Sequence, residues 1–177
     1  NDEISLVTSQ GYSVRTSEEN IRPMGRPSAG VAGIRPGKGD YLVALAVVDN
    51  SEQLLVVSEK GLGKRTPFED YPTKGRGGKG VITMKVTEKT GRVVKALRVA
   101  AEDDIMLMTD TGQSVRIKAE SARLTGRNAQ GVILMKTKDG ETIQDIARVV
   151  SEDDEGGEAE SIDAEGTTSP VEEQDQD

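Results

Sequence analysis

Residues 60–65 read Lys60-Gly61-Leu62-Gly63-Lys64-Arg65, a glycine followed four residues later by an arginine. The same spacing occurs in Gln10-Gly11-Tyr12-Ser13-Val14-Arg15 and in Thr111-Gly112-Gln113-Ser114-Val115-Arg116. Each stretch places a glycine at the second position of a two-residue turn, where the positive φ of a primed hairpin turn favours glycine. The three stretches predict a repeat of about 50 residues built from β-hairpins.

Further columns keep the register of these three glycines. A repeat that holds several positions in step over three copies is the signature of a solenoid or propeller and is not expected by chance. The other columns are Gly25-Arg26, Gly75-Arg76 and Gly126-Arg127; Gly30-Val31, Gly80-Val81 and Gly131-Val132; and Arg35, Lys85 and Lys136. We therefore divide the chain into three units, at residues 1–50, 51–101 and 102–150.

Each unit reads as four short strands. Apolar or alternating stretches are separated by turn signals such as Asp139-Gly140, and no unit sustains a helical apolar period. Short helical turns are expected only at 17–20 and 118–122. In the third unit the strands are expected at 105–109, 114–117, 132–137 and 142–149. The fold class is therefore all-β, with propeller-like blades of four antiparallel strands.

The charge is divided unevenly along the chain. The net charge is −8, from 31 acidic and 23 basic residues. Residues 150–177 hold 12 of the acidic and none of the basic residues, so residues 1–149 carry 23 − 19 = +4. The segment 151–177 has few apolar residues to offset the entropy of ordering, and we expect a disordered acidic tail. A basic body with an acidic tail is typical of nucleic-acid contact.

The composition offers little for catalysis or metal binding. The chain has no cysteine and no histidine, which removes the commonest metal ligands and the commonest general base. The longest apolar run, Tyr41–Val48, is too short for a membrane-spanning helix, and we expect a soluble protein of a reducing compartment. The run Glu102-Asp103-Asp104 is interpreted as a polar connection between units, and the tyrosines as packing residues. We predict no catalytic residue, no metal site and no cofactor for this chain.

The segment Lys74-Gly75-Arg76-Gly77-Gly78-Lys79-Gly80 has the highest density of glycine and positive charge. Its Gly-x-Gly-x-x-Gly spacing is not a dinucleotide fingerprint, because a strand-like stretch follows where that motif needs a helix. It is not a P-loop either, because Gly80 stands where Ser or Thr is required. A flexible solvated turn is the plain alternative. Glycines that admit a close phosphate, beside cations that neutralise it, favour phosphate binding.

Cations at matching places in three consecutive blades predict a curved positive track along one rim. Aromatic residues are only 2% of the chain, which argues against the base-stacking platforms of single-strand binders, and no recognition helix is expected. The expected partner is therefore duplex DNA, bound through its backbone without sequence preference, and bent. The candidate DNA-binding residues are Arg15, Arg22, Arg26, Arg35, Lys64, Arg65, Lys74, Arg76, Lys79, Lys85, Arg116, Lys118, Arg123, Arg127 and Lys136.

Four segments closely resemble the last three blades of the C-terminal domain of DNA gyrase A subunits, and the acidic tail fits many members of that family. The segments are Asn20–Arg26, Tyr71–Lys74, Gly80–Glu88 and Gly126–Leu134. The resemblance implies a β-pinwheel, whose four-stranded blades exchange strands with their neighbours and usually number six. It also implies a bacterial cytoplasmic, nucleoid-associated protein whose basic rim wraps DNA and supports ATP-dependent negative supercoiling.

The same resemblance implies partners outside this chain. They are a gyrase B subunit, in a heterotetramer of two A and two B chains, and the ATP and Mg²⁺ of the parent enzyme. Lys74–Gly80 resembles the family's gyrase A box but has Lys74 for its glutamine and Gly75 for a basic residue, so we interpret it as a degenerate copy. Two alternatives remain: the C-terminal domain of a topoisomerase IV A subunit, and a protein-binding β-propeller.

Overall fold

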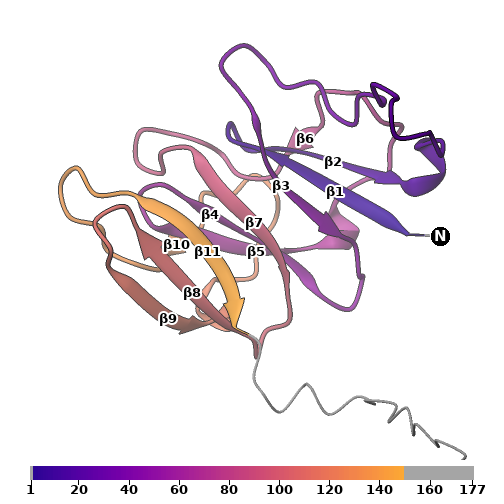
Figure 1. Cartoon of the computed structure of the whole chain (residues 1–177). Helices are drawn as coiled ribbons and strands as arrows, with labels where there is room; N and C mark the ends of the chain where they lie inside the picture. The colour runs from indigo at the N-terminus through magenta and orange to yellow at the C-terminus, as the bar shows by residue number, and fades with distance from the viewer. Residues whose placement is uncertain (1, 150–177) are drawn as a thin grey trace, which may run out of the picture.

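The computed structural model describes residues 2–149, and the predicted acidic tail lies outside them. Figure 1 shows three small antiparallel sheets side by side, with the chain passing from one to the next. No regular α-helix occurs in the described part, where short 3-10 turns η1 (Glu18–Asn20), η2 (Phe68–Asp70) and η3 (Ala119–Ser121) follow the second strand of each unit. The all-β class is confirmed, and so are the expected helical turns at 17–20 and 118–122.

The first sheet takes three strands from the first unit and one from the second. Its order is β3-β1-β2-β6. The second sheet, β10-β5-β4-β7, is built in the same way with a strand of the third unit. The third sheet, β11-β8-β9, has three strands in the described residues. The strands are β1 (Glu3–Thr8), β2 (Tyr12–Ser17), β3 (Leu42–Val47), β4 (Gln53–Ser58), β5 (Leu62–Pro67), β6 (Val81–Ile82), β7 (Val93–Val99), β8 (Asp104–Thr109), β9 (Ser114–Lys118), β10 (Val132–Ile133) and β11 (Ile143–Val149).

Strand exchange joins neighbouring units. Val81 and Ile82 of β6 pair with Ser13 and Tyr12 of β2. In the next joint Val132 and Ile133 of β10 pair with Gly63 and Leu62 of β5. The expected third strand, 132–137, is therefore shorter than predicted and belongs to the sheet of the preceding unit. The strand exchange that the family resemblance implies is confirmed, although the local sequence signal alone could not show which unit supplies the partner strand.

The core lies between the units rather than within each one. Strand β4 is buried on both faces, because Leu54 and Val56 pack toward the first unit while Leu55 and Val57 pack toward the third. The strands β3, β7 and β11, each at one edge of its sheet, lie next to one another along the row of sheets (Figure 1). Because alternate side chains of β4 pack against the first and the third unit, the three units are packed together as one body.

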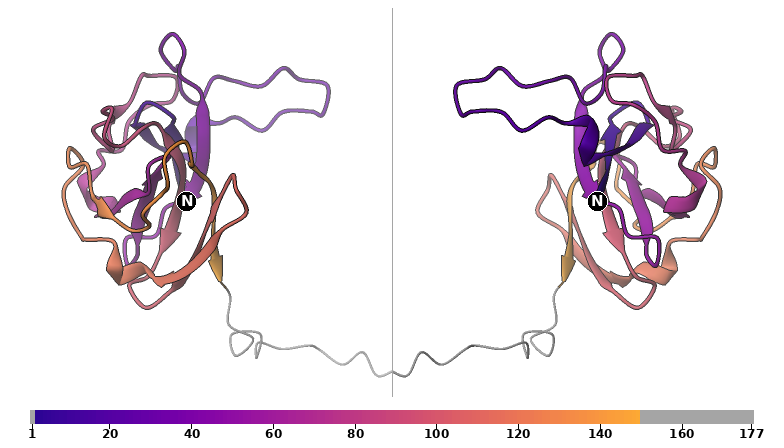
Figure 2. Two further views of the ribbon diagram at one scale, coloured as in Figure 1. Left: turned by 90° about the vertical axis from the view of Figure 1, so that its left-hand side faces the viewer. Right: turned by 90° about the vertical axis from the view of Figure 1, so that its right-hand side faces the viewer.

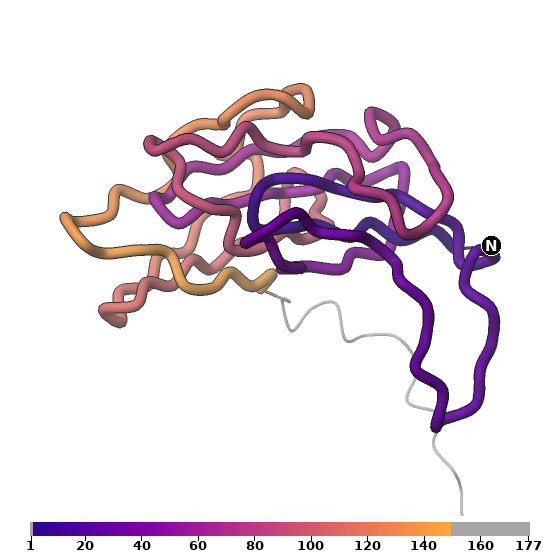
Figure 3. The backbone as a smooth tube through the Cα atoms, turned by 90° about the horizontal axis from the view of Figure 1, so that it is seen from above, coloured from indigo at the N-terminus to yellow at the C-terminus, as the bar shows by residue number. Residues whose placement is uncertain are grey.

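The first unit departs from this pattern. Residues 21–41 contain an isolated bridge at Ile34 but no strand, although four strands were expected in every unit. Figure 2 shows this segment extending away from the sheets, and Figure 3 shows the same extension from above. We call residues 29–35 the arm. In the other two units the corresponding segments contain the exchanged strands β6 and β10.

Candidate nucleic-acid interface

The loop Lys74–Gly80 rests on the first unit. The Lys74 N–H donates to the Arg15 carbonyl of β2 at 2.9 Å, and the Gly77 N–H donates to the Gly33 carbonyl at 2.6 Å. Gly78 in turn accepts a bond of 2.9 Å from the Arg35 N–H. The loop of the second unit is thereby bonded, along its length, to both β2 and the arm of the first unit.

Two of the glycines in this loop serve the joint between units. Gly80 has φ +88°, and a Cβ there would lie 2.4 Å from the Ser13 carbonyl oxygen. Gly77 has φ +77° and faces the carbonyl of Ala32. From the sequence, these glycines were expected to admit a close phosphate. The structure shows a close approach to neighbouring protein backbone, while Gly75 and Gly78 have no such neighbour.

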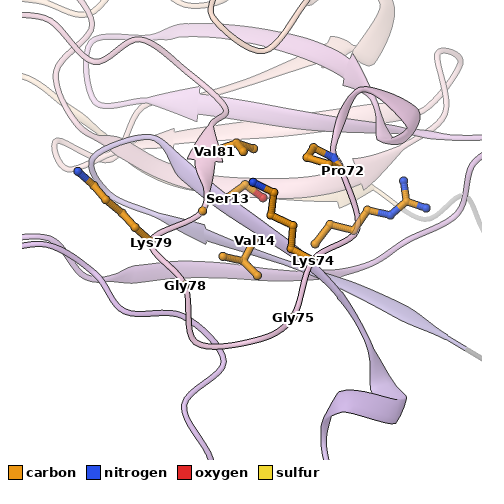
Figure 4. A pocket seen from close by; sticks show the side chains of 10 residues that line it. Ser13, Val14, Pro72, Lys74, Gly75, Gly78, Lys79 and Val81 are labelled. Carbon is orange, nitrogen blue, oxygen red and sulfur yellow. The ribbon is translucent and has the colours of Figure 1, made fainter.

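A cavity of about 200 Å³ lies between this loop and β2. Ser13, Val14 and Arg15 form its floor, and the loop from Pro72 to Val81 encloses it. Figure 4 shows the side chains of Lys74 and Lys79 on either side of this hollow. Both lysines are exposed. Two exposed ammonium groups on flexible side chains beside a hollow can contact a phosphate as point charges.

The third unit has a cavity at the corresponding place, of about 140 Å³. It lies under the loop from Arg123 to Val132. Where the second unit has Lys74 and Lys79, the third unit has Thr125 and Gln130. Arg123 is the cation among its lining residues. The cavity recurs with the repeat, but its positive charge is concentrated in the second unit.

Arg76 and Arg127, from the Gly-Arg column, hydrogen-bond the loop of their own unit to the preceding unit. Arg76 donates from Nε to the Asn20 carbonyl at 2.8 Å and from a terminal nitrogen to the Ala32 carbonyl at 3.5 Å. Arg127 donates to the Ile82 carbonyl at 3.3 Å, and Ile82 stands at the position of Ala32 one unit later. Successive loops are therefore in contact and form one row.

Arg15 and Arg65 are buried in the joints between units. Arg15 is 8% exposed, bonds the carbonyl oxygens of Phe68 (2.7 Å) and Tyr71 (3.5 Å), and forms an ion pair with Glu3. The Thr73 hydroxyl and the Arg15 guanidinium both hold the pKa of Glu3 below its usual value. Arg65 is 7% exposed and binds the Ala122 carbonyl at 2.9 Å.

The arginine column of Arg15, Arg65 and Arg116 was predicted to contact the phosphates of a polyanion. The structure corrects this prediction for Arg15 and Arg65, which are buried. In the first two units this arginine donates to carbonyls at the 3-10 turn of the next unit, which accounts for its recurrence there. In the third unit the equivalent residue, Arg116, is exposed and pairs with Asp104, as does Lys118 at 2.8 Å. These two bonds lower the pKa of Asp104, and they offset part of the positive charge there.

Lys64 is also buried. Its ammonium donates to the carbonyl oxygens of Gly126 (2.7 Å) and Arg127 (2.5 Å), so it holds the loop of the third unit in place. Burial, together with the nearby Arg127 guanidinium, lowers the pKa of Lys64 to about 8, and Asp70 opposes this shift. Lys64 was predicted to contact DNA, but in this position its charge is enclosed by protein.

Because of Lys64, the free energy of unfolding should change with pH in the alkaline range. Its pKa is about 8 in the folded chain against a usual value of 10.5. Between these two pH values the unfolded chain therefore binds more protons than the folded chain. The free energy of unfolding should therefore rise as the pH increases from about 8 to about 10. Urea unfolding at several pH values measures this. In Lys64→Met the extra rise should vanish, and an identical slope in both proteins would contradict the assignment.

The remaining candidates are exposed or partly exposed. They are Arg22, Arg26, Arg35, Lys74, Arg76, Lys79, Lys85, Arg123, Arg127 and Lys136. Lys85 lines a further cavity of about 220 Å³ beside Tyr12. The Lys79 ammonium lies 4.6 Å from the centre of the Tyr12 ring. All tyrosines were predicted to be packing residues. This holds for the buried Tyr71, whereas Tyr12 lies beside Lys79 and Tyr41 is 52% exposed.

The described residues 2–149 contain no cluster of three or more possible metal-ligating Asp, Glu, His or Cys side chains. Over the same range no helix is long and apolar enough to cross a membrane.

Comparison with known proteins gives concordant results. The protein-family model of the DNA gyrase C-terminal domain, described as a β-propeller, matches residues 2–49, 52–100 and 103–149. The chain is 44% identical over 158 residues to the DNA gyrase A subunit of Deinococcus deserti, covering 86% of this chain and 20% of the relative. It is 44% identical over 154 residues to the corresponding Escherichia coli protein, covering 87% and 18%. The chain thus spans about a fifth of these relatives.

Two solved structures share the fold. A DNA gyrase A C-terminal domain superposes with a TM-score of 0.79 at 24% identity, covering 85% of this chain and 51% of the other. The C-terminal domain of a DNA topoisomerase IV gives 0.78 at 23% identity, covering 84% and 46%. Both superpositions agree with the strand-exchanged blades described above. Together with the matched family model, they show that this chain belongs to the family of DNA gyrase C-terminal domains, the β-pinwheels of gyrase A subunits.

Proposed function

We propose that this chain binds duplex DNA through the row of loops and bends it without reading its sequence. The observation that supports this proposal is the direct contact between successive loops, each of which carries exposed cations. Lys74 and Lys79 stand over the cavity of the second unit, with Arg22 and Arg26 in the preceding loop and Arg123 in the following one. A polyanion whose charges recur along its length matches such a row.

The aromatic residues support a duplex rather than a single strand as the ligand. Single-strand binders stack successive bases on exposed aromatic rings. Phe68 and Tyr71 are fully enclosed, and the two other aromatic side chains, Tyr12 and Tyr41, each have a cation over the ring. The structure therefore offers positive charge for a phosphate backbone but no row of free stacking surfaces.

The parent protein is proposed from its relatives, several of which are DNA gyrase A subunits. In this proposal the chain is the non-catalytic, DNA-wrapping part of a bacterial type IIA topoisomerase. Strand cleavage, ATP hydrolysis with Mg²⁺ and pairing with a gyrase B subunit in a heterotetramer belong to other parts of that enzyme. The wrapped segment would bias strand passage toward negative supercoils, in the bacterial cytoplasm.

A titration with a short fluorescent duplex at several salt concentrations tests the DNA-binding proposal. If about seven cations of the loops contact phosphates, log K should fall with log salt with a slope of roughly −6. A duplex of shuffled sequence should bind equally well, because no base is read, and a single strand of equal length more weakly. Failure to bind any duplex at low salt would overturn the proposal.

The topoisomerase IV alternative is favoured by the nearly equal superposition on that domain. Such a domain would bind DNA without wrapping it strongly. A supercoiling assay of the parent enzyme with and without this chain separates the two candidates. Loss of negative supercoiling on removal supports the gyrase assignment, while retained relaxation or decatenation alone supports the alternative. No observation in the structure favours the protein-binding propeller.

A further inference from the structure

The exchanged strand β6 carries an exposed isoleucine within the row of loops. Ile82 is 41% exposed, whereas Val81 beside it and its partner Tyr12 on β2 are half-buried. The third unit is in place next to Ile82, because Arg127 donates to the Ile82 carbonyl at 3.3 Å. The side chain is therefore exposed at a joint where the units on both sides are present.

Ile82 and Tyr12 form an apolar pair across the joint between the first and second units. They stand opposite each other in the register of β2 and β6, and they line the same cavity of about 220 Å³. Met84 and Val86 supply further apolar wall, and Lys85 is the cation among the lining residues. The apolar pair is thus part of a hollow at the surface.

Cations stand on both sides of the apolar pair. Lys79 lies three residues before Ile82 and Lys85 three residues after it, and both lysines are exposed. The Lys79 ammonium is 4.6 Å from the centre of the Tyr12 ring, and Lys85 borders the cavity. Along this short segment the surface therefore changes from positive to apolar and back to positive.

The next joint repeats the apolar pair and the cation that follows it. Ile133 of β10 stands opposite Leu62 of β5, as Ile82 stands opposite Tyr12. Lys136 follows Ile133 by three residues, the spacing that separates Lys85 from Ile82. The arrangement is therefore a feature of the joint rather than of one position.

A nucleic-acid strand shows the same alternation of charge and apolar surface. Its phosphates are separated by deoxyribose rings, whose carbon–hydrogen faces are apolar, and proteins that bind duplexes contact both phosphate and sugar. An exposed isoleucine gains free energy when such a face removes it from water. A sugar carries no sequence information, so this contact suits a surface that does not read bases.

We propose that Ile82, supported by Tyr12, packs against a deoxyribose of the bound duplex, between phosphates contacted by Lys79 and Lys85. This inference rests on the proposed function, because it adds a contact to the same row of loops. The two kinds of contact differ in their response to salt. The lysine contacts release counterions and weaken as salt increases, whereas the apolar contact releases none and contributes equally at every salt concentration.

Ile82→Val and Ile82→Thr together test the sugar contact. Both new side chains are β-branched, nearly equal in shape and suited to a strand. Threonine would place a hydroxyl in the contact without a hydrogen-bond partner. In fluorescence titrations Ile82→Thr should bind a short DNA duplex about fivefold more weakly than Ile82→Val at every salt concentration. The slope of log K against log salt should be the same for both variants.

Leu42→Val and Leu42→Thr are the matched control pair. Leu42 is 49% exposed and lies on β3, at the opposite edge of the sheet from β6. These two variants should bind the duplex equally well, because position 42 lies outside the row of loops. Lys79→Ala combined with Lys85→Ala should give the opposite signature, a slope that is shallower by about 1.8.

The outcomes separate the sugar contact from the proposed function. Equal affinities of Ile82→Val and Ile82→Thr, with a steep salt slope in both, would contradict the sugar contact and leave the proposed function standing. A loss in Ile82→Thr that comes with a shallower slope, or that Leu42→Thr shares, would also contradict the contact. If the unaltered chain bound no duplex at low salt, the contact and the proposed function would both be wrong.

Discussion

Replacing Lys74 and Lys79 by alanine together is expected to weaken duplex binding about 60-fold at about 0.1 M salt, because each phosphate contact contributes roughly 0.9 log unit there. Both ammonium groups stand beside the cavity of the second unit, and neither side chain holds the fold together as Arg76 does. The slope of log K against log salt should also become shallower by about 1.8. Fluorescence titrations at several salt concentrations measure both quantities.

Lys38→Ala combined with Lys89→Ala is the matched control for this prediction. It removes the same charge from two exposed turns that lie outside the row of loops. This control should lose only a few-fold in affinity through the general field of the protein. Equal losses in the two double variants would show that net charge, and not the loop, determines binding.

Gly61→Ala should cost at least about 3 kcal/mol of unfolding free energy, the range of the most damaging single substitutions. Gly61 has φ +78°, and a Cβ there would lie 2.0 Å from the Met135 carbonyl oxygen. That carbonyl belongs to backbone and cannot turn aside as a side chain would. The Gly61 carbonyl also receives the Leu134 N–H at 2.8 Å. The methyl group therefore forces the third unit away from β5 and exposes the shared core.

Gly112→Ala separates this clash from the cost of the backbone conformation alone. Gly112 occupies the same turn with φ +85° and has open space around it, so alanine there should cost only about 1–2 kcal/mol. Urea unfolding of both variants gives the comparison. Equal losses would mean that the joint between the second and third units contributes little to stability.

The joints between units divide the predicted DNA-binding residues into exposed and buried ones. The Lys74–Gly80 loop was identified from its composition, and the side chains of Lys74 and Lys79 lie exposed beside a cavity. The column of Arg15, Arg65 and Arg116 looked equally functional, because a repeated surface cation and a repeated buried donor have the same periodicity. Burial distinguishes them, and burial depends on contacts between residues about 50 positions apart.

The roles of Lys64 and Tyr12 also could not be assigned from local sequence, because Lys64 is buried and Tyr12 is partly exposed. A lysine is normally exposed, but Lys64 is enclosed because the Gly126 and Arg127 carbonyls of the next unit converge on its ammonium. A lone tyrosine after a turn is normally a packing residue, but Tyr12 lies under Lys79, which comes from the next unit. Neither position carries a local signal of the neighbour that decides its role.

Local sequence was enough to establish the repeat, the strands and turns, and the loops that carry the cations. Those features depend on glycines at positive φ and on apolar alternation, which act over a few residues. The exchange of β6 and β10 into the preceding sheets, and the burial of three predicted DNA contacts, depended on the packed structure. Strand exchange joins segments far apart in the chain, so its energy resides in interfaces that no single repeat contains.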